Sequence, residues 1–197
     1  VLMNKHLEFY FDFVSPYSYI AHKEILKLVK KNSLKVDYKP ILLGGLHNMH
    51  GIKAPAFIPS KARFMIRDCK MVSEKYNQIF KFNSYFPIRT VNLMRGVFVA
   101  EEDDFKGFYI DSMFDAIWRD GFNMNDQNII DKILKNIGVN PKTFYLRSTT
   151  AVIKDKLKDK TTLAFERGVF GAPTFLVNNK IFWGQDRLEF ALKELLK

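Results

Sequence analysis

Cysteine is nearly absent from this sequence: Cys69 is the only one among 197 residues. A single cysteine excludes a disulfide within the chain and a metal site built from several cysteines. Cys69 lies in a segment with helical periodicity, where a lone cysteine packs as a small apolar side chain. We therefore expect Cys69 to be a buried residue of a helix.

Long hydrophobic runs are also missing, although 47% of the residues are hydrophobic. No segment approaches the roughly 20 apolar residues that a membrane-spanning helix needs. The apolar stretch near the N-terminus is interrupted by Glu8 and Asp12, which does not fit a signal peptide. These absences predict a cytoplasmic protein without a membrane partner, and the length suits one sizeable core.

Acidic residues are outnumbered by lysine and arginine, and the formal net charge is +10. Such an excess can indicate binding of nucleic acid or of an anionic ligand. The lysines are scattered, as in Lys30, Lys31 and residues 154–160, without an arginine-rich groove that has interleaved aromatics. We predict a solvated lysine-rich surface, no nucleic-acid partner, and a mild positive field that attracts small acids.

Metal ligands are sparse as well. His47 and His50 have the i, i+3 spacing of two ligands on one helix face, but residues 40–59 contain no Asp, Glu or Cys. The sequence therefore predicts no metal site.

The N-terminal segment has the pattern of a β-α-β unit. Residues 6–13 are aromatic and almost continuously apolar, which predicts a strand buried on both faces. Residues 16–31 have the spacing of an amphipathic helix, and residues 34–40 alternate as a second strand does. The two strands should be parallel, because a helical crossover connects them.

The middle of the chain is helical after two predicted loops, residues 40–46 with their glycine hinge and residues 52–59. The predicted helices cover residues 60–82, 90–101, 104–119, 125–137, a short segment from Pro141, and 148–167. A stripe of methionine and phenylalanine either forms core or lines an apolar ligand pocket; it comprises Met65, Met94, Phe98, Phe108, Met113 and Phe114.

The C-terminal segment returns to strands. A strand follows the turn at residues 168–173, Asn178-Asn179 is typical of a hairpin turn, and residues 180–183 form the return strand before a closing helix. The order β-α-β, helical block, α-β-β-α predicts an α/β thioredoxin fold with an all-helical domain inserted after the second strand. The predicted bounds are residues 1–59 and 160–197 for the thioredoxin-like domain, and 60–159 for the insert.

Ser15 occupies the turn between the first strand and the first helix. Pro16 follows it and suits the first helical turn, because proline lacks the N–H group that would have no partner there. Ser15 thus lies at a helix N-terminus, where free N–H groups favour negative charge. Two interpretations are open: Ser15 is only an N-cap, or its hydroxyl donates to an anionic sulfur or oxygen.

Three motifs occur in a set order: FDFVSPYSY at 11–19, GVFGAPTF at 168–175 and FWGQDRL at 182–188. Together they resemble the 2-hydroxychromene-2-carboxylate isomerase family, which is related to kappa-class glutathione transferases and DsbA-like oxidoreductases. The resemblance spans nearly the whole chain and is weakest through residues 100–160. Redox relatives carry Cys-x-x-Cys where this chain has Ser15 and Ser18, so dithiol exchange is excluded here.

The resemblance implies a glutathione-dependent isomerase that interconverts 2-hydroxychromene-2-carboxylate and trans-o-hydroxybenzylidenepyruvate through a glutathione thiolate adduct. Ser15 would stabilise the thiolate. A small aromatic carboxylate substrate and a homodimer are also implied. Two alternatives are a kappa-like glutathione transferase and a non-catalytic module that binds thiols or peptides.

Candidate binding residues follow from the same resemblance. Ala172 and Pro173 match a cis-proline turn whose backbone pairs with an extended peptide. Gln185 and Asp186 would hold the γ-glutamyl end of glutathione, and Lys61 its glycyl carboxylate.

Three aromatic residues, Tyr17, Tyr85 and Trp183, are assigned to the substrate pocket from residue type and neighbourhood. The chain departs from the family at Ile52, where relatives often carry Asn. Ile52 offers no polar side-chain group, so glutathione and another thiol both stay possible.

Overall fold

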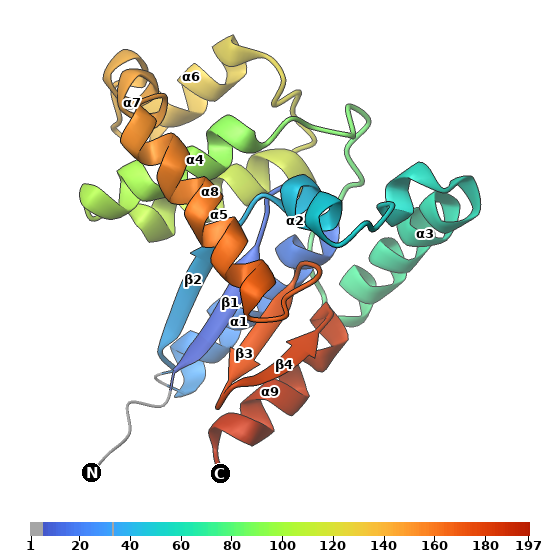
Figure 1. Ribbon diagram of the computed structural model, residues 1–197. Helices are drawn as coiled ribbons and strands as arrows, with labels where there is room; N and C mark the ends of the chain where they lie inside the picture. The colour runs from blue at the N-terminus through green and yellow to red at the C-terminus, as the bar shows by residue number, and fades with distance from the viewer. Residues whose placement is uncertain (1–5, 33) are drawn as a thin grey trace, which may run out of the picture.

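A mixed four-stranded sheet forms the centre of the computed structural model, which describes residues 6–32 and 34–197 (Figure 1). The strand order is β2-β1-β3-β4, with β1 parallel to β2, and antiparallel pairing of β1 with β3 and of β3 with β4. The strands are β1 (Leu7–Phe11), β2 (Val36–Pro40), β3 (Thr174–Val177) and β4 (Lys180–Trp183). The predicted parallel β-α-β unit and the C-terminal hairpin are confirmed.

Strand β1 is largely buried on both faces because helices cover both sides of the sheet. Leu7, Phe9 and Phe11 are fully buried in the larger core cluster, together with residues of α1 (Pro16–Asn32) and α9 (Leu188–Leu195). Tyr10 points to the opposite face, where it packs with residues of α8 (Ala151–Glu166). Figure 1 shows α8 in front of the sheet and α1 behind it. The thioredoxin fold predicted from the element order is confirmed.

The helical block gathers at one end of the sheet, where α4 to α7 lie together, whereas α3 extends to one side (Figure 1). Its elements are α2 (Leu43–Met49), η1 (Pro55–Phe57), α3 (Pro59–Lys75), α4 (Val91–Glu102), α5 (Lys106–Trp118), α6 (Gln127–Asn136) and α7 (Pro141–Ser148). The predicted inner boundary at residues 159/160 lies within α8, which contacts β2 as well as α4 and α7. The domain bounds stay a prediction.

The predicted glycine-hinged loop at residues 40–46 is wrong in its second half, because α2 begins at Leu43. Gly44 and Gly45 each disfavour a helix by about 1 kcal/mol relative to alanine. Tertiary contacts outweigh that cost: Leu46 is fully buried, and the backbone N–H groups of Leu42 and Leu43 donate to side chains of Thr161 and Asp12.

Helix α3 is shorter than the predicted residues 60–82. It ends at Lys75, and Asn77 adopts a positive φ of 52°, which a helix cannot continue through. As a result Ile79, which falls within the predicted helix, lies beyond the end of α3 and is 73% exposed. Five of the six members of the methionine and phenylalanine stripe are buried. The exception is Phe108, whose side chain is 76% exposed.

A half-buried cluster joins β1 to the end of α8. Arg167 donates from both terminal nitrogens to the Glu8 carboxylate, at 2.6 and 3.2 Å, and Tyr10 donates to Glu8 at 2.8 Å. Burial opposes the charge of Glu8, but the hydrogen bonds from Arg167 and Tyr10 prevail and lower the pKa of Glu8 below its ordinary value. The cluster therefore stabilises the fold only while Glu8 is ionised.

We expect Glu8→Gln to lower the free energy of unfolding at neutral pH by about 1–2 kcal/mol, because a charge-assisted hydrogen bond is lost. An acid with a lowered folded pKa contributes stability above its unfolded pKa, and that contribution disappears as pH falls through the folded pKa. Melting temperatures of wild type and variant should therefore converge below about pH 4. A gap that stays constant from pH 7 to pH 3 would contradict this role.

Among the described residues, no helix is both long and apolar enough to span a membrane.

Candidate functional site

Ser15 lies where the end of β1 meets the loop before β3. Its hydroxyl oxygen accepts a hydrogen bond from the Ser18 N–H at 3.1 Å, so the predicted N-cap is confirmed. The same hydroxyl donates to the carbonyl oxygen of Ala172 at 3.1 Å, across 157 positions of sequence. Ser15 is 4% exposed. The fold thus brings the first and second of the three sequence motifs together at one hydroxyl group.

The Ala172–Pro173 peptide bond is cis. The Pro173 carbonyl accepts from the Gly184 N–H at 2.9 Å, which ties this loop to the segment after β4. A side chain at Gly171 would collide with the indole of Trp183, because a Cβ there would lie 2.6 Å from Nε1. Trp183 is 55% exposed and its ring packs against another aromatic residue of the loop, Phe170, at 5.1 Å between centroids.

The segment after β4 begins at Gly184, whose φ of 105° favours glycine. It continues into η2 (Gln185–Arg187), which contacts α1. Gln185 Oε1 is buried without a hydrogen-bond partner among the residues placed in the structure. Asp186 is exposed and pairs with Arg187 at 2.7 Å. This segment therefore presents two acceptor side chains, one of them unsatisfied.

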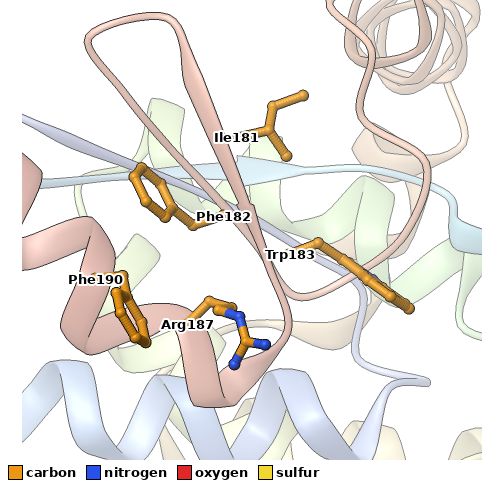
Figure 2. Close-up of a pocket in the computed structure, with 5 residues that line it drawn as sticks. All are labelled: Ile181, Phe182, Trp183, Arg187 and Phe190. Carbon is orange, nitrogen blue, oxygen red and sulfur yellow. The ribbon is translucent and has the colours of Figure 1, made fainter.

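A surface hollow of about 420 Å³ lies beside β4 (Figure 2). The Arg187 guanidinium and the Phe190 ring lie on one side of it, 5.7 Å apart, and Trp183 lies on the other. The hollow is lined by Ile181, Phe182, Trp183, Arg187 and Phe190. Aromatic rings around a single cationic group can take up a small planar acid.

Tyr17 connects α1 to α3. Its hydroxyl donates to Asp68 Oδ2 at 2.7 Å. Lys61 is exposed in the first turn of α3, about two turns before Asp68 and thus on a similar face of the helix. Cys69 is fully buried and free, as expected, and burial raises the pKa of its thiol to about 12. The thiol of Cys69 stays protonated and inert at neutral pH.

Tyr85 and Ile52 lie apart from this arrangement. Within residues 6–32 and 34–197, no hydrogen bond or ring contact joins Tyr85 to Ser15 or Trp183, and the Tyr85 ring is 51% exposed. Ile52 is 38% exposed, and its backbone N–H donates to His47. In the described part of the chain no group of three His, Cys, Asp or Glu residues is arranged to hold a metal ion.

One residue of the site went unnoticed in the sequence. Asp12 follows β1 directly and is fully buried, and its backbone carbonyl accepts from the Ser15 N–H at 3.0 Å. Its signal was present: it is a carboxylate that directly follows three consecutive aromatic residues of a strand. A buried acid needs several hydrogen-bond donors, and the local sequence pattern does not show which residues supply them.

The comparisons with known proteins agree with the fold. The chain is 29% identical over 198 residues to 2-hydroxychromene-2-carboxylate isomerase of Sphingobium xenophagum, which covers 98% of this chain and 100% of the relative. It is 25% identical over 197 residues to glutathione S-transferase kappa 1 of Rattus norvegicus, covering 93% and 87%. A solved structure of 2-hydroxychromene-2-carboxylate isomerase has a TM-score of 0.87 at 23% identity, covering 96% and 93%.

Both curated relatives are named as enzymes, which supports an enzymatic function at the level of the family. Residues 6–196 match the family described as DSBA-like thioredoxin domain. The match contains Ser15, the cis-proline loop and the segment after β4. The chain therefore belongs to the DSBA-like thioredoxin domain family.

Proposed function

We propose that the protein is a glutathione-dependent isomerase of the 2-hydroxychromene-2-carboxylate type. The observation that carries the proposal is the Ser15 hydroxyl, which caps α1 and lies 3.1 Å from the Ala172 carbonyl beside a cis-proline. A hydroxyl at a helix N-terminus, in the position where redox relatives carry a thiol, suits stabilisation of a thiolate. The names of two curated relatives, an isomerase and a glutathione transferase, support an enzymatic function at the level of the family.

The residues present fit glutathione. The unsatisfied Gln185 Oε1 and the exposed Asp186 carboxylate would receive the γ-glutamyl ammonium group. The Ala172 backbone would pair with the extended tripeptide, and Lys61 would meet the glycyl carboxylate. Glutathione supplies the nucleophilic thiol when it is bound. The chain has no substitute for it, because Cys69 is buried and its pKa of about 12 keeps the thiol protonated.

Ser15 has one hydroxyl hydrogen, which lies on the Ala172 carbonyl in this structure. To stabilise a thiolate, that hydrogen turns from the carbonyl to the sulfur. The Ser18 N–H stays on the Ser15 oxygen during this change and keeps the hydroxyl oriented. A charge-assisted hydrogen bond is stronger than the neutral one it replaces, so the exchange favours the thiolate.

The hollow beside β4 supports a small aromatic carboxylate as the substrate, since rings of Trp183 and Phe190 stand around the Arg187 guanidinium. We assign Trp183 to the substrate pocket because it lines this hollow, whereas the assignment of Tyr17 stays a prediction from the sequence. Tyr85 does not line this hollow, and its assignment to the substrate pocket also stays a prediction. A homodimer and a cytoplasmic location also stay predictions.

Glutathione binding and isomerisation test the proposal together. Glutathione at 100 times its dissociation constant should stabilise the protein by about 2.7 kcal/mol, which raises the melting temperature by roughly 5–10 °C. Conversion of 2-hydroxychromene-2-carboxylate, followed by absorbance, should require glutathione. Absence of both effects would overturn the proposal.

Two further outcomes separate the alternatives. Chloride release from an aryl halide without chromene conversion would identify a kappa-like transferase, as the name of the rat relative suggests. A melting-temperature shift without turnover of either compound would indicate a module that only binds thiols.

A further inference from the structure

The turn that presents Ser15 is organised around the side chain of Asp12, which the proposed function does not use. Asp12 Oδ1 accepts from the Val14 N–H at 3.0 Å and from the Thr90 hydroxyl at 2.6 Å, and Oδ2 accepts from the Leu43 N–H at 2.9 Å. No lysine, arginine or histidine contacts this carboxylate in the described part of the chain. Three neutral donors therefore stabilise a fully buried acid.

The donor set explains why an acid occupies this position. A carboxylate accepts from all three partners, whereas an asparagine would direct an N–H group at one of the donors. Burial raises the pKa of Asp12, and hydrogen bonds from Thr90, Leu43 and Val14 oppose that rise by favouring the charged form. Geometry and donor count thus both select an acceptor-only side chain.

The three donors come from segments far apart in the sequence. Val14 belongs to the Ser15 turn, Leu43 is the first residue of α2, and Thr90 directly precedes α4. The Thr90 hydroxyl makes no capping bond to α4 and is committed to Asp12 instead. The turn is therefore fixed by the helical block and not by its own residues alone.

The backbone of the next residue, Phe13, is also bound by side chains of the helical block. The Phe13 N–H donates to the sulfur of Met94 at 3.4 Å, and the Phe13 carbonyl accepts from Trp118 Nε1 at 2.8 Å. Met94 and Trp118 belong to α4 and α5, and both are fully buried. Helices α4 and α5 thus both bind the backbone directly after Asp12.

We propose that Asp12 is a positioning residue that holds the Ser15 hydroxyl at the cis-proline loop, and that the helical block controls thiolate stabilisation through the Thr90–Asp12 hydrogen bond. The inference rests on the proposed function. The change that it predicts in the pKa of the bound thiol is opposite to the change expected from charge alone. A buried negative charge near a thiol raises the pKa of that thiol, so its removal alone would lower the pKa. Loss of positioning raises the pKa of the bound thiol.

Asp12→Asn separates these effects when glutathione is the ligand. The pKa of the bound thiol is read from the ultraviolet absorbance of its thiolate, and glutathione affinity from calorimetry. We expect a higher thiol pKa and about tenfold weaker binding at neutral pH, because a buried donor is left unsatisfied. In a Ser15→Ala background, Asp12→Asn should cause no further rise in the pKa. An unchanged or lowered pKa, or an equal rise in both backgrounds, overturns the proposal.

Substitution of Thr90 provides the test if Asp12→Asn does not fold. Thr90→Val keeps the shape of the side chain and removes the donor. Like Asp12→Asn, it should raise the pKa of the bound thiol. Thr90→Ser keeps the hydroxyl and should restore the wild-type pKa; failure of this rescue overturns the proposal. If wild type binds no glutathione, the proposed function falls and this inference with it. If wild type binds and converts the chromene but the Thr90 variants behave alike, only the inference falls.

Discussion

Ser15→Ala is expected to reduce glutathione-dependent isomerisation by roughly 100- to 1,000-fold, the usual cost of removing one donor from a developing anion. The hydroxyl that donates to Ala172 in this structure is the group we assign to the thiolate. Initial rates at saturating glutathione and substrate measure the effect. The fall should appear in kcat, because the variant keeps Gln185, Asp186 and Lys61 for binding.

The same substitution also removes an N-cap, since the Ser18 N–H loses its acceptor. That loss lowers the free energy of unfolding by about 1 kcal/mol, or roughly 2–4 °C in melting temperature. Asp126→Ala is a matched control, because Asp126 caps α6 by accepting from the Asn128 N–H at 2.9 Å. It should cost similar stability and leave the isomerisation rate unchanged. Equal losses of activity in both variants would mean that Ser15 acts only as a cap.

Local pattern was sufficient for the elements around Ser15. The apolar run of β1 and the helical spacing of α1 reflect burial, which the periodicity of the sequence is enough to predict. In β2 the apolar positions Val36 and Tyr38 pack against the larger core cluster. The hairpin turn at Asn178-Asn179 follows from side chains that tolerate positive φ, and both residues adopt it. The meeting of Ser15 with Ala172 then follows from the order of strands in the sheet.

Contacts between segments far apart in the sequence cannot be predicted from such local patterns. Helix α2 forms despite two glycines because Asp12 and Thr161 bind its first turn from other elements. The early end of α3 depends on the left-handed conformation of a single residue, Asn77. The periodicity of the sequence does not indicate that conformation. The role of Asp12 depends on Thr90, which lies 78 positions away. Such residues carry little local signal because their partners, and not their neighbours, decide what they do.

Gly96→Ala should destabilise the helical block by about 2–4 kcal/mol, although alanine is favoured over glycine in a helix by about 1 kcal/mol. A Cβ at Gly96 of α4 would lie 2.7 Å from Tyr109 Cζ and 2.8 Å from Phe144 Cζ. Tyr109 cannot move aside cheaply, because it is 1% exposed and its hydroxyl donates to the Leu93 carbonyl at 2.8 Å. The close approach of three helices therefore outweighs intrinsic helix propensity.

Gly107→Ala separates packing from propensity. Gly107 lies in the first turn of α5 and is exposed, and a Cβ there would meet no atom of the described residues within 4 Å. Its substitution should leave the melting temperature unchanged or raise it slightly, whereas Gly96→Ala should lower it by roughly 5–15 °C. Thermal unfolding of both variants decides the matter. If Gly96→Ala is as stable as wild type, then α4, α5 and α7 are not packed as closely as the structure has them.

Helix α4 also carries Met94 and directly follows Thr90, so a shift of α4 should reach the Ser15 turn. Gly96→Ala should therefore weaken glutathione binding as well.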